Sequence, residues 1–203
     1  MTAPAARLLR LFLVPGGIAV LSAAVMLGGE SWIQALRYDR DAVAGGELWR
    51  LLTAHFTHLG WRHLGMNLAG LFLIWALFGR LLPNGVWLLG LLGTALAVSL
   101  GLWWFDPGLH WYVGLSGVLH GLFMTGVLLS LYLGYRAEFL LLVLILGKLA
   151  WEQLYGPLPG SADFAGGRVI VDAHLYGAVA GVLAAIALIG RQLLRAGRQK
   201  AQQ

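Results

Sequence analysis

A serine and a histidine are the two residues of this chain whose types best fit covalent chemistry. Ser116 lies in the string GLSGVLHG, residues 114–121, and His174 lies in a later apolar stretch. A hydroxyl beside an imidazole forms a nucleophile with its general base, because the imidazole accepts the hydroxyl proton during attack on a carbonyl. Ser116 alone is weak evidence, since a serine at the head of an apolar run also caps helices.

Two pairs of glycines indicate how these residues can meet. Gly117 and Gly121 form one G-x-x-x-G face, and Gly177 and Gly181 form a second face just after His174. Such faces let two helices in a membrane approach closely. If the two helices run in the same direction and pack at these glycines, the serine and the histidine lie near the same end of the contact.

Acyl transfer also needs hydrogen-bond donors for the oxyanion, and one pair of polar residues fits that need. His63 and Asn67 are four residues apart at the start of an apolar stretch, so their side chains share one face of a helix. The alternative is an interhelical hydrogen bond with no catalytic role.

Lys148 and Glu152 are unusual because they are charged residues within a predicted span. They are one helical turn apart, and the favoured interpretation is a structural ion pair that neutralises two costly charges. The functional alternatives are that Glu152 orients His174, or that the pair holds a polar part of a substrate. His120 is the third candidate supporting residue.

A metal site is a weaker interpretation of the histidines. His55, His58 and His63 give a His-x-x-His pattern followed by a third imidazole. The pattern lacks the embedded glutamate and the four-residue spacing of a zinc-protease helix, and no cysteine or nearby acid completes a site. We therefore expect that His55 and His58 shape the loop and that no metal or organic cofactor is needed.

The composition is that of an integral membrane protein. Of 203 residues, 59% are hydrophobic and 11% are charged, whereas a soluble domain has about 25% charged residues. The formal net charge of +5 comes from arginines that flank apolar runs, so membrane topology explains it better than nucleic-acid binding. The absence of cysteine excludes disulfides and thiolate chemistry.

The apolar pattern predicts one all-α membrane domain over residues 1–203, with no soluble domain. Its six spans are expected at residues 11–27, 63–82, 86–105, 114–133, 139–155 and 169–189. A long outer loop, residues 28–62, is partly amphipathic and should form short helices at the membrane interface. A cleaved signal peptide at the N-terminus is the less favoured interpretation of the first span, because the apolar run continues beyond Ser22-Ala23-Ala24.

The positive-inside rule gives this bundle an orientation. With six spans, the arginines near both termini and in two of the turns all fall on one side: Arg7, Arg10, Arg80, Arg136, Arg191, Arg195 and Arg198. Both termini are then cytoplasmic. The fourth and sixth spans run from outside to inside, which places Ser116 and His174 near the outer face.

Four ordered motifs together resemble rhomboid intramembrane serine proteases. They are Trp49-Arg50, His63-x-x-x-Asn67, Gly114-x-Ser116-Gly117 and Ala173-His174-x-x-Gly177-x-x-x-Gly181. The resemblance implies a six-helix rhomboid-like bundle and a Ser116/His174 catalytic dyad. It also implies an oxyanion site made by His63, Asn67 and the Ser116 backbone N–H. The expected partners are the lipid bilayer and single-span membrane protein substrates.

Several features depart from the general rhomboid pattern. His120 occupies a position where many bacterial rhomboids carry a tyrosine that stacks on the catalytic imidazole. The GLSGVLHG string, the Lys148-x-x-x-Glu152 pair and the Asp172-Ala173-His174 run look like the rhombosortase subfamily. This resemblance implies a bacterial inner-membrane enzyme and protein sorting, with substrates that carry a C-terminal Gly-Gly motif, one span and a basic tail.

Three other functions are weighed against this one. The chain can be a general rhomboid protease of other substrates, or a rhomboid-like protein that binds client helices without cutting them. Such non-catalytic relatives usually lose the serine or the histidine, and both are present here. A small transporter would explain the intramembrane charges as an ion path, but not the matched depth of Ser116 and His174.

Overall fold

The structure is a computed structural model that describes the backbone of residues 3–200 and the side chains of residues 11–199. It is mostly helical. Six long helices are α1 (Ala3–Leu27), α5 (Trp61–Phe78), α6 (Asn84–Phe105), α7 (Ser116–Tyr132), α8 (Phe139–Tyr155) and α10 (Val171–Lys200). Shorter elements connect them: α2 (Gly29–Leu36), β1 (Tyr38–Asp39), α3 (Arg40–Ala44), α4 (Arg50–Thr53), η1 (Ala54–Phe56), β2 (Trp111–Tyr112), η2 (Arg136–Glu138) and α9 (Ser161–Ala165).

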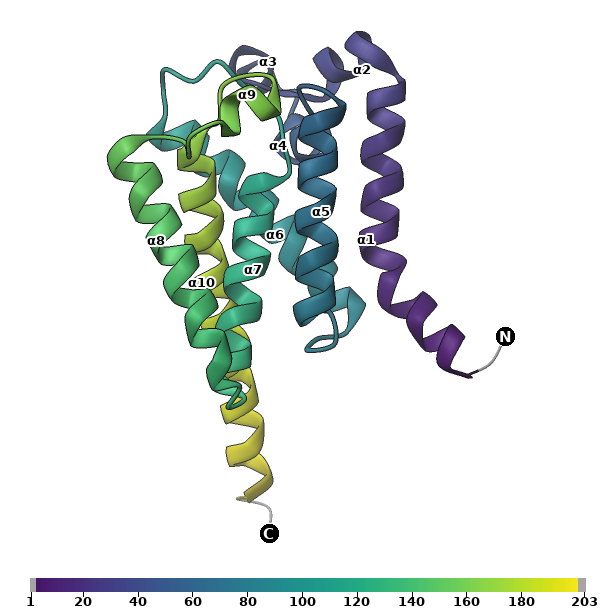
Figure 1. Cartoon of the computed structure of the whole chain (residues 1–203), viewed down its shortest axis with the longest axis vertical. Coiled ribbons are helices and arrows are strands. Elements are labelled where there is room, and N and C mark those ends of the chain that lie inside the picture. Colours follow the sequence, from purple (N-terminus) through teal and green to yellow (C-terminus); the bar gives the residue numbers. More distant parts are fainter. Residues whose placement is uncertain (1–2, 201–203) are drawn as a thin grey trace.

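The long helices stand side by side, and the short elements gather mainly at one end of them (Figure 1). Helices α2, α3 and α9 lie at the upper end of this view. The first turns of α1 and the last turns of α10 both lie at the opposite end. The side of a membrane on which each end of the bundle lies stays a prediction.

Each predicted span corresponds to one long helix, with shifts at the ends. Helix α5 ends at Phe78 rather than at residue 82, and α10 continues past residue 189 to Lys200. Helix α1 continues through Pro15 without interruption. Within the part of the chain that the structure describes, two helices, α6 and α10, are long and apolar enough to cross a membrane, and the bent pair α1 and α2 adds a third if it is counted as one span. The count of six spans stays a prediction.

The long loop before α5 is a folded buttress, as its amphipathic pattern predicts. It forms the short helices α2, α3 and α4, and β1 pairs antiparallel with β2. The Arg40 guanidinium donates to the carbonyls of Leu102, Trp103, Asp106 and Leu109 at 2.7–3.1 Å, where α6 has run out of intrahelical donors. These bonds tie the loop to the segment that leads into Ser116.

Helices α7 and α10 pack through their glycines, as the two G-x-x-x-G faces predict. A Cβ atom added to Gly117 would lie 2.7 Å from the Ala173 carbonyl oxygen, and one added to Gly121 would lie 2.6 Å from the Gly177 carbonyl oxygen. The contacts advance together along both helices, so the helices run in the same direction. Only glycine lets the two backbones come this close.

Candidate active site

The glycine contact places the serine and the histidine beside each other. Ser116 is the first residue of α7, and His174 lies in the first turn of α10. Ser116 Oγ and His174 Nε2 are 2.9 Å apart, which is hydrogen-bonding distance. The hydroxyl is partly accessible, whereas the imidazole is buried. The structure therefore brings together the two residues whose chemistry the sequence singles out.

A carboxylate from a third helix contacts the other nitrogen of this imidazole. Glu152 Oε2 lies 2.9 Å from His174 Nδ1 and 2.7 Å from Lys148 Nζ. Lys148 and Glu152 thus form the ion pair that their spacing predicts. Because Glu152 also reaches His174, the pair belongs to the site and is more than an isolated neutralised charge.

His120 stacks on the same imidazole from α7. The two ring centroids are 4.2 Å apart and the planes differ by 14°. His120 Nδ1 lies 2.7 Å from the Ser116 carbonyl oxygen. A carbonyl only accepts, so Nδ1 carries the proton and Nε2 is left as an acceptor. The ring supports His174 as an aromatic residue would.

His63 and Asn67 present donors beside the segment that precedes Ser116. The Leu59 backbone N–H donates to His63 Nδ1 at 3.3 Å, so the proton of His63 sits on Nε2. Asn67 Nδ2 is buried and has no protein hydrogen-bond partner. A Cβ atom on Gly114, whose φ is +124°, would lie 3.1 Å from His63 Nε2 and 3.9 Å from Asn67 Nδ2. Both donors therefore flank one point near Ser116.

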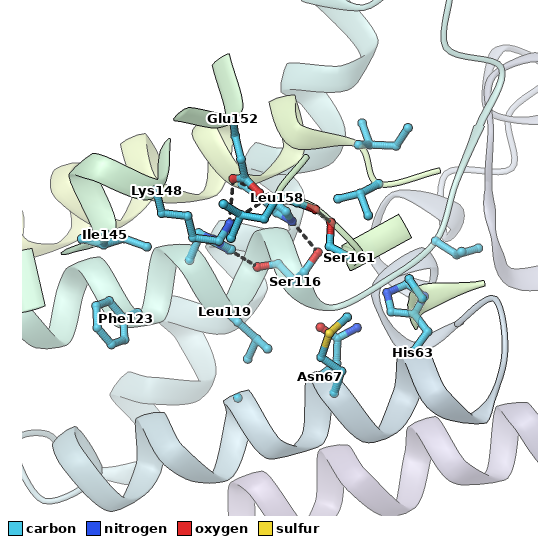
Figure 2. Close-up of a pocket in the computed structure, with 18 of the residues that line it drawn as sticks. His63, Asn67, Ser116, Leu119, Phe123, Ile145, Lys148, Glu152, Leu158 and Ser161 are labelled. Atoms are coloured by element: carbon cyan, nitrogen blue, oxygen red, sulfur yellow. Dashed lines mark hydrogen bonds and ion pairs between the residues drawn. The ribbon is translucent and has the colours of Figure 1, made fainter. Parts of the chain in front are cut away.

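These side chains line one cavity, which Figure 2 shows. Its volume is about 450 Å³, and its wall includes Ser116, His174 and both predicted oxyanion donors. The rest of the wall is mainly apolar and comes from α5, α7, α8 and the α9 segment: Met66, Leu73, Ile74, Leu119, Phe123, Leu144, Ile145, Leu158 and Ala165. The apolar lining suits an extended or partly unwound hydrophobic chain better than a polar metabolite.

The described residues contain one group of metal-ligating side chains close together, and it does not suit an ion. His120, Glu152 and His174 each offer an atom within 4.8 Å of the others. The two imidazoles are stacked, however, so their in-plane lone pairs run parallel and do not converge. Both nitrogens of His174 also have hydrogen-bond partners.

His55 and His58, the other histidines of the metal interpretation, have structural positions. His55 Nε2 donates to the Ala95 carbonyl at 2.9 Å and connects η1 to α6. Burial lowers the pKa of His55 to about 4 and the pKa of His58 to about 3, so both are neutral near pH 7. The ring of His58 packs edge-on against His63, with centroids 5.0 Å apart.

Tyr112 is a residue of the site that the sequence analysis did not single out. Its hydroxyl donates to the Gly114 carbonyl at 2.8 Å and helps to hold the turn before Ser116, where Gly114 has a positive φ. Its ring is buried and packs edge-on against His55. Burial raises the pKa of the Tyr112 hydroxyl, which therefore stays a donor. Its place two residues before Gly114 is the signal that points to it.

Comparisons with known proteins agree on one family. The Rhomboid domain model matches residues 45–191. The chain is 33% identical over 148 residues to Rhomboid-like protein 11, chloroplastic, of Arabidopsis thaliana, a match covering 66% of this chain and 50% of that protein. It is 32% identical over 144 residues to the Putative rhomboid protease YdcA of Bacillus subtilis, covering 70% of this chain and 67% of that protein.

A third relative is Rhomboid protease GluP of Bacillus subtilis, 29% identical over 171 residues. That match covers 78% of this chain but 31% of GluP, so this chain spans about half or less of two of the three relatives. The family match contains all four sequence motifs and every residue of the Ser116 site. The chain belongs to the rhomboid family.

Proposed function

We propose that this protein is an intramembrane serine endopeptidase in which Ser116 is the nucleophile and His174 is the general base. The observation that carries the proposal is the 2.9 Å contact between Ser116 Oγ and His174 Nε2 in an apolar cavity. A hydroxyl is a weak nucleophile until an adjacent base removes its proton. Membership of the rhomboid family, which includes relatives named as proteases, supports the same activity.

The proposed reaction has two halves. Ser116 Oγ attacks the scissile carbonyl carbon while its proton moves to His174 Nε2. The tetrahedral intermediate collapses, the C–N bond breaks, and Nε2 returns the proton to the leaving amine. Water then attacks the acyl ester of Ser116 and gives a proton to His174 Nε2. The bond between the acyl carbon and Ser116 Oγ breaks, Nε2 returns the proton to Oγ, and the released carboxylic acid leaves the enzyme in its starting state.

His63 and Asn67 are proposed to stabilise the oxyanion of each tetrahedral intermediate. His63 Nε2 carries a proton, and Asn67 Nδ2 has no protein partner. Hydrogen-bond donors that are already in place stabilise an oxyanion more strongly in a cavity without bulk water than they would in solution. The first turn of α7 adds backbone N–H groups, Ser116 among them, that have no intrahelical acceptor.

The proposed substrates are single-span membrane proteins with a C-terminal Gly-Gly segment just outside the span. The apolar wall formed by α5 and α8 can accept a hydrophobic chain from the bilayer. Glycine costs a helix about 1 kcal/mol per residue relative to alanine, so Gly-Gly presents unwound backbone to Ser116. The proposed location is the bacterial inner membrane, with both termini cytoplasmic and the site open to the outer side.

The first test uses the full chain in detergent and a serine-directed fluorophosphonate. The wild type should be labelled, and Ser116→Ala and His174→Ala should not be labelled although both stay folded. A double variant should be little worse than either single variant, because the two residues act as one unit. Substantial cleavage by Ser116→Ala would contradict the mechanism.

The second test separates the substrate classes. A reporter with Gly-Gly, one span and an arginine tail should be cut on the outer side, and Leu-Leu in place of Gly-Gly should protect it. Equal cutting of both reporters would indicate a general rhomboid protease. Binding of the Gly-Gly reporter without any cutting or labelling would indicate a non-catalytic client-binding protein.

A further inference from the structure

We propose that Glu152 and Lys148 are positioning residues that keep His174 in the one state able to act as a base. Glu152 holds the proton of His174 on Nδ1, and Lys148 balances the charge of Glu152 so that the imidazole stays neutral before reaction. The inference rests on the proposed protease function. It extends the two-residue site of α7 and α10 to a third helix, α8.

The tautomer of His174 is the first step of the argument. To accept the Ser116 proton, Nε2 must carry a free lone pair, so the proton of the neutral ring must sit on Nδ1. A buried N–H without an acceptor is destabilising, because it has lost its bond to water and gained none in the protein. Glu152 Oε2 supplies that acceptor at 2.9 Å, and a carboxylate cannot donate in return. The other tautomer, with its proton on Nε2, would place the Nδ1 lone pair against the Glu152 oxygen at 2.9 Å, and its only donor there would be the more distant Lys148 Nζ at 3.5 Å.

The charge of Glu152 is the second step. Its side chain is 3% exposed, and a carboxylate so far from water requires a compensating positive charge. Two groups lie close enough to provide one: Lys148 Nζ at 2.7 Å and the imidazole of His174 at 2.9 Å, both on the same oxygen. With Lys148 present, the compensation is complete and His174 can stay neutral.

Removing Lys148 would shift this balance onto the histidine. A lone buried carboxylate is best compensated by a proton on the adjacent imidazole, because the pair then becomes Glu⁻ and His⁺. An imidazolium has no lone pair at Nε2 and cannot accept the Ser116 proton. Lys148 is thus expected to matter for turnover although its Nζ bonds to neither the serine nor the substrate carbonyl.

A merely structural ion pair makes a different prediction. Such a pair would fasten α8 to α10, and replacing both charges by apolar residues of similar size would leave the protein folded and active. The variant Lys148→Met with Glu152→Leu makes this replacement. Under our proposal the variant folds, because no charge is left unpaired, but His174 loses its acceptor at Nδ1.

The experiment compares this apolar pair with a second pair, Lys148→Met with Glu152→Gln. Glutamine keeps an acceptor for Nδ1 but has no charge. For the apolar pair we expect the kcat for the Gly-Gly reporter to fall by roughly 10³-fold, by analogy with the loss of the orienting carboxylate in soluble serine proteases. The glutamine pair should retain more activity, about tenfold more, with KM nearly unchanged in both. Thermal unfolding of both pairs should match the wild type.

Single variants give an independent measurement. Lys148→Arg keeps the cation and should retain kcat within about tenfold, whereas Lys148→Met should lose about 100-fold or more in kcat and in the fluorophosphonate labelling rate. Glu138→Gln, just before α8, is the matched control for a lost carboxylate and should label normally. If the apolar pair does not fold, the comparison of Lys148→Arg with Lys148→Met, normalised to the amount of folded protein, still tests whether the positive charge at position 148 is needed.

The two proposals fail in different ways. If the fluorophosphonate does not label the wild type at Ser116, the protease function itself is overturned. Normal labelling in the wild type, with a folded apolar pair that cuts as fast as the wild type, would overturn only the role of Glu152 and Lys148. Equal activity of Lys148→Met and Lys148→Arg would overturn the charge balance.

Discussion

Helix α7 packs against α10 on one side and faces α5 and α8 across the cavity on the other. On the α10 side, glycines bring two backbones into contact, and Thr125 Oγ1 adds a hydrogen bond to the Gly181 carbonyl at 3.1 Å. On the other side, α8 buries only Ile145, Leu149 and Glu152. Ser116 and His174 meet at the tight contact, and the cavity that we propose for the substrate lies on the open side.

This difference assigns a separate task to each side. The Ser116 and His174 side chains come from α7 and α10, so their separation depends on a backbone contact that cannot slide without a clash. A shift of 1 Å in a reacting group costs roughly 100-fold in rate. In the proposed function the open side also has to admit a substrate chain, while His63, Asn67 and Glu152 hold their places beside the reacting pair.

The largest expected effect comes from breaking the tight side. Gly177→Val would place side-chain atoms on the Gly117 carbonyl, so α7 and α10 must separate. We expect more than about 100-fold loss of cleavage, and a loss of stability of about 1–3 kcal/mol or more. Reporter cleavage and thermal unfolding in detergent measure the two effects.

Gly190→Val is the matched control for this substitution. Gly190 lies on the same helix, and a Cβ atom there would meet nothing within 4 Å. It should therefore retain cleavage close to the wild type. If Gly177→Val also cuts at the normal rate, the glycine contact does not hold the reacting pair in place.

The next largest effect concerns a donor that faces the cavity. Asn67→Ala removes the unpartnered Nδ2 group, and we expect kcat to fall by about 10²–10³-fold while KM stays nearly constant. Partial activity should remain, because His63 still donates. A change in KM alone would show that Asn67 docks the substrate and does not stabilise the oxyanion.

The sequence predicts the tight side of this molecule better than the open side. Small residues at four-residue spacing report directly on close helix packing, and so Gly117, Gly121, Gly177 and Gly181 lead to the meeting of Ser116 and His174. Apolar runs likewise locate the six long helices, although α1 begins and α10 ends well outside the predicted spans. These signals are local, and each depends on one or two segments.

The sequence offers the contact between Glu152 and His174 only as a less favoured alternative to an isolated ion pair. This contact depends on the rotation and depth of α8, whose sequence is mainly apolar apart from Lys148, Glu152 and Gln153. The four-residue spacing indicates the ion pair but does not show which third residue it meets.

The pH dependence of stability tests whether the loop before α5 is packed firmly enough to keep His55 and His58 neutral. Burial lowers the pKa of His55 from 6.5 to about 4 and that of His58 from 6.5 to about 3. The unfolded chain takes up these protons first as the pH falls below about 6.5. Stability should therefore be full above that pH and fall by about 2–3 kcal/mol per histidine by about pH 4.5.

Thermal unfolding above about pH 6.5 and at about pH 4.5 measures this loss of stability. His58→Leu should reduce the loss by roughly half, because one of the two histidines no longer takes up a proton. His58 suits this substitution because neither of its ring nitrogens has a protein partner. An unchanged pH dependence in His58→Leu would show that its imidazole is not kept neutral by the fold.

The smallest expected effect comes from narrowing the open side. Leu144 and Leu140 are one turn apart on α8 and are 59% and 63% exposed, but only Leu144 lines the cavity. Leu144→Trp should raise the KM of the membrane reporter by roughly tenfold, because a bulky ring competes with the entering chain. The kcat should change little, since α8 carries no atom that bonds to the substrate carbonyl in the proposed reaction. Leu140→Trp should leave both values unchanged, and an equal rise in KM for both variants would place substrate entry elsewhere on the bundle.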